Sequence, residues 1–151
     1  MSSLKLCKIA NDGSVAHVGA QSQIVKDVCM ATAKMYGISG FQEPWIGYLA
    51  LIENQIVGTC SFRAPKDGRV EIAYFTFPGH EGAGIGTAMA KELTRIAFHE
   101  DASMKVFAQT LAEENASTII LKKLGFERTK ELLHEDAGVV WEWELLNQKN
   151  I

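Results

Sequence analysis

The sequence predicts one domain of the α+β class, with a mixed, mostly antiparallel sheet of about six to seven strands flanked by helices. First, short β-branched and aromatic runs separated by turn residues fill residues 45–77, which is typical of consecutive hairpins. Second, two stretches with helical spacing then alternate with strand-like stretches, which is typical of strand–helix–strand crossovers. Third, the chain of 151 residues shows no repeat, low-complexity tract or linker, so residues 1–151 are expected to form a single domain.

The N-terminal third is predicted to form a strand, a helix and a loop. Residues 4–10 read as a strand that the turn-forming residues 11–13 end. The helix that follows is expected to end at Gly37, because glycine at a helix C-terminus readily takes a left-handed conformation. Residues 38–44 are expected to form a loop. The face of this helix that should pack on the core contains Ile24, Val28, Ala31 and Met35.

The middle of the chain is predicted to form an antiparallel meander. Residues 45–52 and 55–63 read as two strands joined by a tight turn at Glu53-Asn54. A second turn, at residues 65–68, leads into a strand over residues 70–77. This third strand is rich in β-branched and aromatic residues, and it becomes the centre of the predicted sheet.

The C-terminal half is predicted to alternate helices and strands. Residues 105–111 read as a strand, and residues 115–124 as a capped helix that Gly125 ends. A return strand is expected from Phe126, and residues 138–145 alternate cleanly enough to form the last strand. The helix before these elements should bury one stripe, which contains Ile85, Met89, Leu93 and Ile96.

A glycine-rich turn between the central strand and its helix carries the main functional signal. Pro78 and Gly79 end the strand, and Gly82, Gly84 and Gly86 follow before the helix. Such a turn aims free backbone N–H groups and the positive end of the helix dipole at one point, which suits a phosphate group. A tight connection without any ligand is the alternative.

The spacing of this turn excludes two other phosphate-binding motifs. A P-loop requires lysine where Ile85 stands, and the dinucleotide fingerprint requires a third glycine where Thr87 stands. What remains is Gly-x-Gly-x-Gly-Thr after a strand. The stretch resembles the cofactor-binding motif of the GNAT superfamily of N-acetyltransferases, whose core reads Arg/Gln-x-x-Gly-x-Gly/Ala. Glu81 occupies the Arg/Gln position, where a carboxylate adds no attraction for a diphosphate.

A second segment resembles the same family. Residues 114–126 are similar to the family's Asn-x-x-Ser…Lys-Leu-Gly-Phe segment, although Asn115 lies one residue nearer the Gly-Phe pair than in the common form. Leu121 stands where many members carry a tyrosine that protonates the leaving thiolate, and leucine cannot donate a proton. The match runs over residues 45–145, and an ordinary capped helix would explain this second segment taken alone.

The resemblance implies a GNAT-like fold with a splayed central strand and acetyl-CoA as the co-substrate. The amides of the turn would bind its pyrophosphate, and backbone groups of Phe75 and Phe77 would pair with the pantetheine arm, in a slot opened by a bulge in the strand. A backbone N–H near Phe75 would face the thioester oxygen. The cofactor-binding residues so implied are Phe75, Thr76, Phe77, Gly82, Ala83, Gly84, Ile85, Gly86, Thr87, Asn115 and Ser117.

Glu71 is the candidate base for the reaction. By alternation it shares a strand face with Ala73, Phe75 and Phe77, which is an unusual setting for a carboxylate. Some members of the family use a glutamate at this position to deprotonate the amine, usually through water, and partial burial would raise the pKa of Glu71. The alternative is an ion pair with a cross-strand arginine such as Arg63.

The expected activity is transfer of an acetyl group to a primary amine by direct attack in a ternary complex. A small molecule is the first choice of acceptor, because the chain is short and mildly acidic. The alternatives are acetylation of a protein N-terminus or lysine, and a non-catalytic acyl-CoA-binding sensor or interaction domain. Trp45, Tyr48, Tyr36 and Phe41 either line an acceptor pocket or belong to the core.

Charge and composition exclude other classes. The net charge is −3 and the sequence pI is about 5.8, so neither a nucleic acid nor an anionic membrane is an expected partner. No apolar run suits a membrane span, residues 1–7 lack a signal peptide's long apolar region, and a cytoplasmic location is expected. Residues 140–143 would pair across a homodimer if they form an edge strand, and packing inside one subunit explains them equally well.

No metal is expected either. The cysteines and histidines show neither metal-ligand spacing nor a disulfide pattern, and free thiols and solvated histidines explain them better. His80 lies inside the glycine turn, where a neighbour of bound phosphate is a commoner role than a catalyst. The residues concerned are Cys7, Cys29, Cys60, His17, His80, His99 and His134.

Overall fold

Seven strands form one mixed sheet in the computed structural model, which describes residues 3–16 and 21–146. The strands lie in the order β1-β2-β3-β4-β5-β7-β6, and every neighbouring pair is antiparallel except β4 and β5, which are parallel. The predicted α+β fold with a mostly antiparallel sheet is therefore confirmed. The strands are β1 (Lys5–Lys8), β2 (Gly47–Ile52), β3 (Gln55–Phe62), β4 (Arg69–Thr76), β5 (Lys105–Leu111), β6 (Glu127–His134) and β7 (Gly138–Leu145).

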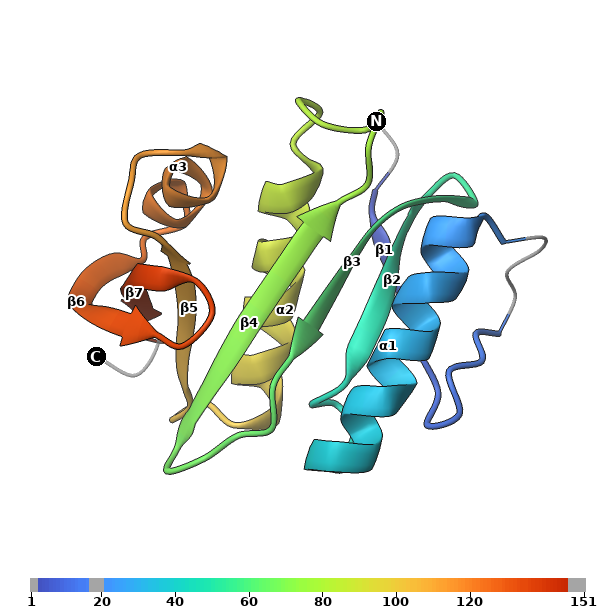
Figure 1. Ribbon diagram of the computed structural model, residues 1–151, viewed down its shortest axis with the longest axis horizontal. Helices are drawn as coiled ribbons and strands as arrows, with labels where there is room; N and C mark the ends of the chain where they lie inside the picture. Colours follow the sequence, from blue (N-terminus) through green and yellow to red (C-terminus); the bar gives the residue numbers. More distant parts are fainter. Residues whose placement is uncertain (1–2, 17–20, 147–151) are drawn as a thin grey trace.

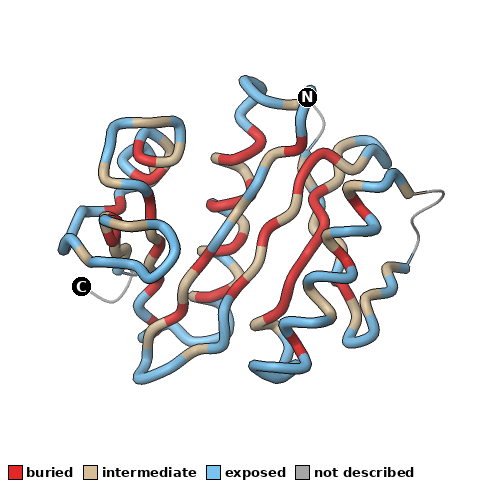
Figure 2. Tube along the Cα trace, viewed as in Figure 1, coloured by how far each residue is buried: buried red, intermediate tan, exposed pale blue. Residues whose placement is uncertain are grey.

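Three helices cover the sheet in the described part of the chain. α1 (Gln23–Ser39) lies on one face, across β1 and β2, and α2 (Ile85–Glu100) lies on the other face, behind β3 and β4 (Figure 1). The short α3 (Ala116–Lys123) follows β5 and lies at one end of the group formed by β5, β7 and β6 (Figure 1). Figure 2 shows that buried residues gather where α2 and the middle strands face each other.

The first helix differs from its prediction at its end and on its buried face. α1 continues past Gly37 to Ser39, and Gly40 follows with a φ of 94° while its N–H donates to the Tyr36 carbonyl at 2.8 Å. Glycine inside a helix weakens it without stopping it, whereas the positive φ at Gly40 ends it. The buried residues are Val25, Cys29 and Tyr36. Of the predicted stripe, Ile24 and Val28 are partly buried against the core, whereas Ala31 and Met35 are exposed.

Tyr36 explains the shifted face. Its hydroxyl donates to the Ile9 carbonyl at 2.9 Å and accepts the Gly47 N–H at 2.8 Å. A tyrosine whose hydroxyl has two partners is stable in a core, because no polar group is left unbonded there. Both partners lie outside the helix, so spacing within the helix could not reveal them.

α2 packs as predicted. Ile85, Met89 and Leu93 are buried, and Ile96 is partly buried against the same core. Gly58 on β3 permits this close approach, because a Cβ there would lie only 3.1 Å from the end of the Met89 side chain. The helix that follows the glycine turn is therefore held firmly against the sheet.

β4 and β5 pair only at their first residues and then separate. Their register joins residues 69–71 to residues 105–107. Beyond these residues, β4 pairs only with β3, and β5 pairs only with β7. In Figure 1 the two strands diverge toward the end that carries the glycine turn. The predicted splayed strand is confirmed, but the predicted bulge is wrong, because the register shifts lie between β2 and β3 and between β6 and β7.

β7 is an inner strand, paired with β5 on one side and with β6 on the other. The alternative in which residues 140–143 form a sheet edge and pair across a dimer is therefore wrong, and the strand packs inside one subunit. Glu142 of this strand is 3% exposed, and its carboxylate accepts a hydrogen bond from the Arg69 guanidinium at 2.8 Å, with the Lys130 Nζ at 3.5 Å. This ion pair joins β4 to β7 across β5.

The described residues hold neither a membrane-spanning helix nor a metal cluster. No helix among them is long and apolar enough to cross a membrane. Within residues 3–16 and 21–146, no three His, Cys, Asp or Glu side chains gather closely enough to hold a metal ion. Cys29 and Cys60 are buried free thiols and Cys7 is half-buried, whereas His17 lies outside the described residues.

Candidate active site

The glycine-rich turn presents an unblocked helix N-terminus. Gly79, Gly82 and Gly84 have φ values of 91°, 81° and 77°, which other residues rarely adopt. Gly84 is the N-cap of α2 and has no side chain to bond the helix amides, and the first helical bond runs from the Ala88 N–H to the Gly84 carbonyl at 3.0 Å. The N–H groups of residues 85–87 therefore point out of the helix end.

A cavity of about 460 Å³ lies in front of these amides. The end of β4, the glycine turn, the start of α2 and the first turns of α3 bound it. A volume of this size suits a small-molecule ligand. Its lining residues are Tyr74, Phe75, Thr76, His80, Glu81, Gly82, Gly84, Ile85, Gly86, Thr87, Ala116, Ser117, Ile119 and Ile120.

Most of the predicted cofactor-binding residues line this cavity, and Phe77, Ala83 and Asn115 do not. Asn115 is the N-cap of α3: its side-chain oxygen accepts the Thr118 N–H at 3.0 Å, and its own N–H donates to the Thr118 hydroxyl at 2.9 Å. Asn115 therefore acts in this structure as a helix cap, which was also predicted, and not as a wall of the cavity. The predicted residues that do line it are Phe75, Thr76, Gly82, Gly84, Ile85, Gly86, Thr87 and Ser117.

Glu81 folds back onto the glycine turn. Its carboxylate accepts the Gly79 N–H at 2.7 Å. Hydrogen bonds from backbone N–H groups of the turn, its own first, lower the pKa of Glu81 below the usual glutamate value. The carboxylate is therefore ionised near neutral pH, and it occupies one amide of the anion-binding turn.

One edge of β4 is bonded to β3. The Glu71 carbonyl accepts the Arg63 N–H at 3.0 Å, and the Phe77 N–H donates to the Val57 carbonyl at 2.9 Å. Backbone groups alternate between the two edges of a strand, so those of Phe75 also face β3. The prediction that Phe75 and Phe77 offer backbone groups to a ligand is therefore wrong, because β3 uses these groups.

The other edge of β4 is open beyond its short pairing with β5. By the same alternation, the backbone N–H groups of Tyr74 and Thr76 face the space between β4 and β5. The backbone N–H groups on the open edge are therefore those of Tyr74 and Thr76, and not those of Phe75 and Phe77. Phe75 and Thr76 line the cavity, and the side chain of Phe77 is buried.

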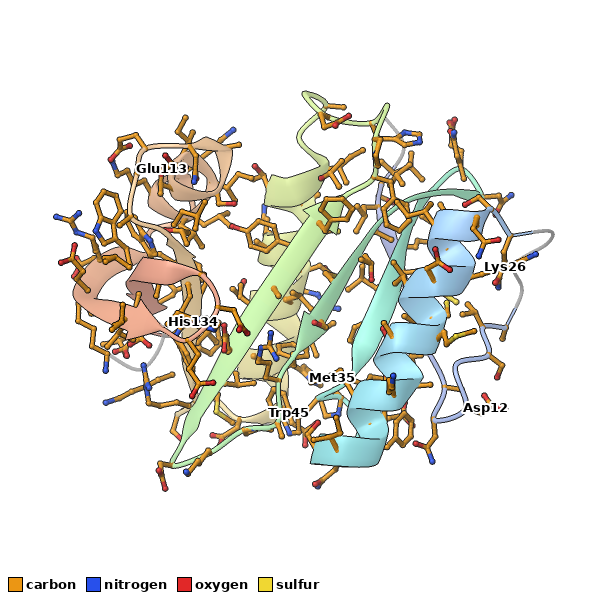
Figure 3. All side chains as sticks on the ribbon, viewed as in Figure 1. Asp12, Lys26, Met35, Trp45, Glu113 and His134 are labelled. Atoms are coloured by element: carbon orange, nitrogen blue, oxygen red, sulfur yellow. The ribbon has the colours of Figure 1, made fainter. Side chains whose placement is uncertain are left out.

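A second cavity, of about 520 Å³, adjoins the first one. β4, β5, α3 and the hairpin of β6 and β7 form its walls, and Figure 3 shows His134 of that hairpin beside β4. Tyr74 and Ser117 line both cavities, so the two spaces meet at these residues. The lining residues are Arg63, Glu71, Ile72, Ala73, Tyr74, Ala108, Gln109, Thr110, Leu111, Ser117, His134, Asp136, Ala137 and Val140.

Glu71 is the half-buried carboxylate of this second cavity. Its side chain is 19% exposed, and the Arg63 Nε lies 3.5 Å from its Oε1. Burial raises the pKa of Glu71, and the positive charge of Arg63 opposes this rise. The predicted ion pair with Arg63 is thus present, and it is accompanied by a raised pKa of the kind that suits a base.

The aromatic side chains near α1 divide between core and surface cavity. Tyr36 and Tyr48 are buried in the core. Trp45 lines a third cavity, of about 420 Å³, which shares Arg63 with the second one. Phe41 is exposed and packs edge-on against Tyr36, with 5.0 Å between ring centroids. Of the four predicted aromatic residues, Trp45 and Tyr36 therefore line this cavity.

A larger cavity, of about 590 Å³, lies along α2 beside Leu4 and Phe98. It contains no residue of β4 or of the glycine turn, and it shares no residue with the two cavities that meet at Tyr74. The volume of a cavity therefore does not by itself identify the candidate site in this chain. The candidate site is the junction of the two smaller cavities, where the free amides and the half-buried carboxylate lie on either side.

Sequence reasoning missed Tyr74 and the apolar wall that α3 provides. Strand alternation could have placed Tyr74 on the face opposite Glu71, which is the face that α2 and α3 cover. Ile119 and Ile120 line the cavity from α3. Leu121, at the family's tyrosine position, is 0% exposed and lines neither cavity, so it packs in the core.

Comparisons with known proteins agree with this geometry. A family model described as "Acetyltransferase (GNAT) domain" matches residues 5–127. A chimeric spermidine N-acetyltransferase from Vibrio cholerae and hSSAT has a TM-score of 0.72 and 14% identity, with 98% of each chain covered. The ribosomal-protein-S5-alanine acetyltransferase from Vibrio fischeri has a TM-score of 0.68 and 13% identity, with 96% of this chain and 92% of that chain covered.

A third similar structure contains a ligand. It is a ribosomal L7/L12 alpha-N-protein acetyltransferase in complex with coenzyme A, with a TM-score of 0.69 and 13% identity, and with 97% of this chain and 96% of that chain covered. At these identities the three structures show that the fold is shared. No curated protein matches the chain.

Proposed function

This chain belongs to the GNAT family of acetyltransferases, and from this premise we propose that it transfers the acetyl group of acetyl-CoA to a primary amine of a small molecule. Membership makes the chain an acyltransferase that uses acetyl-CoA. One observation carries the finer proposal: a cavity with an open helix N-terminus and a cavity with a half-buried carboxylate meet at Tyr74 and Ser117. In this proposal residues 1–151 act as one domain.

The first cavity fits a diphosphate followed by an extended chain that carries amides. The N–H groups of residues 85–87 would hold the pyrophosphate of acetyl-CoA. The backbone groups of Tyr74 and Thr76 would bond the amides of the pantetheine arm and the thioester oxygen. Acetyl-CoA supplies the acetyl group as a thioester. Phe75 and Ile120 line the same cavity and shield these bonds from water.

In the second cavity, Glu71 would accept the proton that the amine loses, directly or through one water. A base is needed because an alkyl ammonium group has a pKa of about 10 and is mostly protonated at neutral pH. Glu71 lines the cavity, and the rise in its pKa that burial causes brings it closer to the pH at which an enzyme works. Arg63 keeps the carboxylate oriented from the exposed side.

The acceptor cavity favours a small amine. Its volume of about 520 Å³ lies within the range of small-molecule sites. Glu71 and Asp136 place two carboxylates on its walls against the one guanidinium of Arg63, and this excess attracts an ammonium group. Acetylation of a protein N-terminus is the second candidate, since two of the three similar structures act on ribosomal proteins and one acts on spermidine according to their names.

An acetyl-transfer assay tests the proposal. The protein is incubated with acetyl-CoA and, in separate reactions, with a polyamine, an amino-acid amide and a peptide that has a free N-terminus, and released thiol is followed. We expect release with a small amine, and much less release by the Glu71→Gln protein. Release with the peptide alone would support the protein acceptor. Binding of acetyl-CoA without release in any reaction would support a non-catalytic sensor.

A further inference from the structure

The mechanism described above assigns no role to the hydroxyl group of Tyr74. This hydroxyl is buried, and within the described residues it makes no hydrogen bond of ordinary geometry, although the Ser117 side chain lies close enough to interact with it. Buried hydroxyl groups are normally bonded, so an unbonded one marks a place that a ligand or water completes. Tyr74 also lines both cavities, a position that it shares with Ser117. Because Ser117 lies beside the hydroxyl and lines both cavities too, the hydroxyl lies next to the junction through which an acetyl group would pass.

We propose that the Tyr74 hydroxyl donates a hydrogen bond to the sulfur atom of coenzyme A, and thereby stabilises the negative charge that develops on sulfur during acetyl transfer. This inference rests on the proposed function, because it requires the acetyl group to move from the first cavity to the second. The reacting atoms then lie where the two cavities meet, which is where Tyr74 lies.

The chemistry of the step requires such a donor. The amine nitrogen forms a bond to the acetyl carbon, the carbon–sulfur bond breaks with its electron pair left on sulfur, and Glu71 receives the proton that the amine loses. A fixed hydrogen-bond donor aimed at developing charge lowers the barrier of a reaction in a site shielded from water. Leu121 cannot serve, because it has no donor and is fully buried outside both cavities.

The hydroxyl donates a hydrogen bond and keeps its proton. Burial raises the pKa of Tyr74 to about 12, while the nearby Ser117 side chain acts in the opposite direction. A thiol like that of cysteine has a pKa of about 8.5, so full proton transfer from this phenol to the thiolate would be uphill by about three and a half pKa units. Tyr74 therefore stays neutral during turnover, and the sulfur takes its proton from solvent afterwards.

A purely structural role for Tyr74 is the alternative, because its ring packs near the start of α2, where a Cβ on Gly86 would lie 3.9 Å from it. Tyr74→Phe separates the two roles, since it keeps the ring and removes only the hydroxyl. Tyr48→Phe is the matched control. It removes another buried tyrosine hydroxyl, bonded to the Pro44 carbonyl at 2.6 Å, from a residue that lines neither cavity.

Ligand binding provides a readout that does not depend on turnover. The dissociation constants of coenzyme A and of desulfo-coenzyme A, which lacks the sulfur, are measured by calorimetry for the wild type and both variants. At about pH 9.5 the thiolate predominates while Tyr74 is still protonated, so the wild type should prefer coenzyme A by about tenfold. Tyr74→Phe should lose this preference and Tyr48→Phe should keep it.

The comparison isolates the hydroxyl from the other charges of the two cavities. These charged and titratable groups act on the thiolate of coenzyme A but are the same in all three proteins, so their effect on the preference cancels when the proteins are compared. They are Arg63, Glu71, His80, Glu81, His134 and Asp136. An equal preference for coenzyme A in the wild type and Tyr74→Phe would overturn the inference, whatever the turnover of either protein.

Kinetics give the second readout. The kcat of Tyr74→Phe should fall about tenfold to a hundredfold, with little change in the KM for acetyl-CoA. The loss should be the same from about pH 6 to about pH 9, because a phenol with so high a pKa does not titrate there. Unchanged kcat would overturn the inference. If the wild type acetylates no amine but its sulfur preference depends on Tyr74, the proposed function fails and the contact with sulfur stands.

Discussion

At Glu71, two opposing influences act on the pKa of one side chain. Burial raises it, and the guanidinium of Arg63, 3.5 Å away, lowers it. A base works only when ionised, so kcat/KM should fall as the pH drops through this raised pKa, at a pH above the ordinary glutamate value of about 4.3. Glu71→Gln should remove this acid limb and lower kcat by about a hundredfold or more, as measured by thiol release across the pH range.

Arg63 provides the control for that profile. Arg63→Gln removes the influence that lowers the pKa of Glu71, so the acid limb should move to higher pH. A carboxyl group with a raised folded-state pKa contributes stability below its unfolded pKa and loses it as the pH rises through the folded value. Glu71→Gln should therefore not lower the Tm at neutral pH. Full activity in Glu71→Gln would show that the ion pair is only structural.

Glu81 places a negative charge in the turn that should receive a diphosphate. Like charges repel, and water and salt screen the repulsion at an exposed site, so its effect on affinity is only a few-fold. Glu81→Gln removes the repulsion and weakens the bond to the Gly79 N–H, so calorimetry should show acetyl-CoA bound a few-fold more tightly. Glu100→Gln makes the same charge change at the far end of α2 and should leave the affinity unchanged. Weaker binding by Glu81→Gln would contradict this account.

At the scale of the element, α3 begins at a cap whose two hydrogen bonds join Asn115 and Thr118. Asn115→Ala should destabilise the protein by about 1 kcal/mol and lower the Tm by about 2–4 °C. The KM for acetyl-CoA should change little, because Asn115 does not line the cofactor cavity. Thermal unfolding and steady-state kinetics check both, with Asn115→Asp, which keeps an oxygen cap, as the control. A raised KM with an unchanged Tm would favour a cofactor contact.

Elements whose ends depend on local chemistry are predictable from the sequence. β5 and β7 have their predicted bounds, and Gly125, with a φ of 92°, follows α3 as expected. α1 is different, because its apolar residues permit more than one buried face. The face that packs on the core contains Tyr36, whose hydroxyl forms hydrogen bonds with backbone groups of other segments. No pattern within the helix contains that information.

β4 marks the limit of prediction for the site. The glycine turn lines its cavity as the motif implies, because glycine conformations and the helix start are local properties. Which edge of β4 stays open depends on its pairing with β3, which is a long-range property. The sequence therefore placed the free backbone groups on Phe75 and Phe77, whereas the structure places them on Tyr74 and Thr76.

At the scale of the whole molecule, the Arg69–Glu142 ion pair joins the two halves of the sheet. β4 and β5 pair only over residues 69–71, so few backbone bonds make the same connection. Loss of the cation beside a buried carboxylate costs about 3–5 kcal/mol, and Lys130, 3.5 Å from Glu142, reduces that loss. Arg69→Met should therefore lower the free energy of unfolding by about 3 kcal/mol, measured in urea.

An exposed ion pair on α2 gives the matched comparison for that prediction. Arg95 pairs with Glu92 on the surface of the helix, and Arg95→Met should change the free energy of unfolding by less than about 1 kcal/mol. Equal losses in the two variants would mean that Arg69 is one more surface contact, and that packing and the short pairing of β4 with β5 hold the halves of the sheet together.

The order of the strands is a property of the whole chain that local patterns do not contain. β7 follows β6 in sequence but lies inside it, between β5 and β6. Its alternating residues suit an edge strand and an inner strand equally well, so the sequence left both open. In the structure, ladders with β5 and β6 make it an inner strand, and the Glu142 carboxylate fits this position with partners from β4 and β6 on either side.

Where β4 and β5 separate, two strand edges whose backbone groups pair with no neighbouring strand face the same gap. Another polypeptide chain can add a strand to such an unpaired edge, so these edges promote aggregation. A coenzyme whose amides bond to one of these edges blocks that pairing, as a partner strand would. Bound coenzyme A should then protect this protein from aggregation as well as support its turnover. Protein freed of coenzyme A should therefore aggregate at a lower temperature than protein saturated with it.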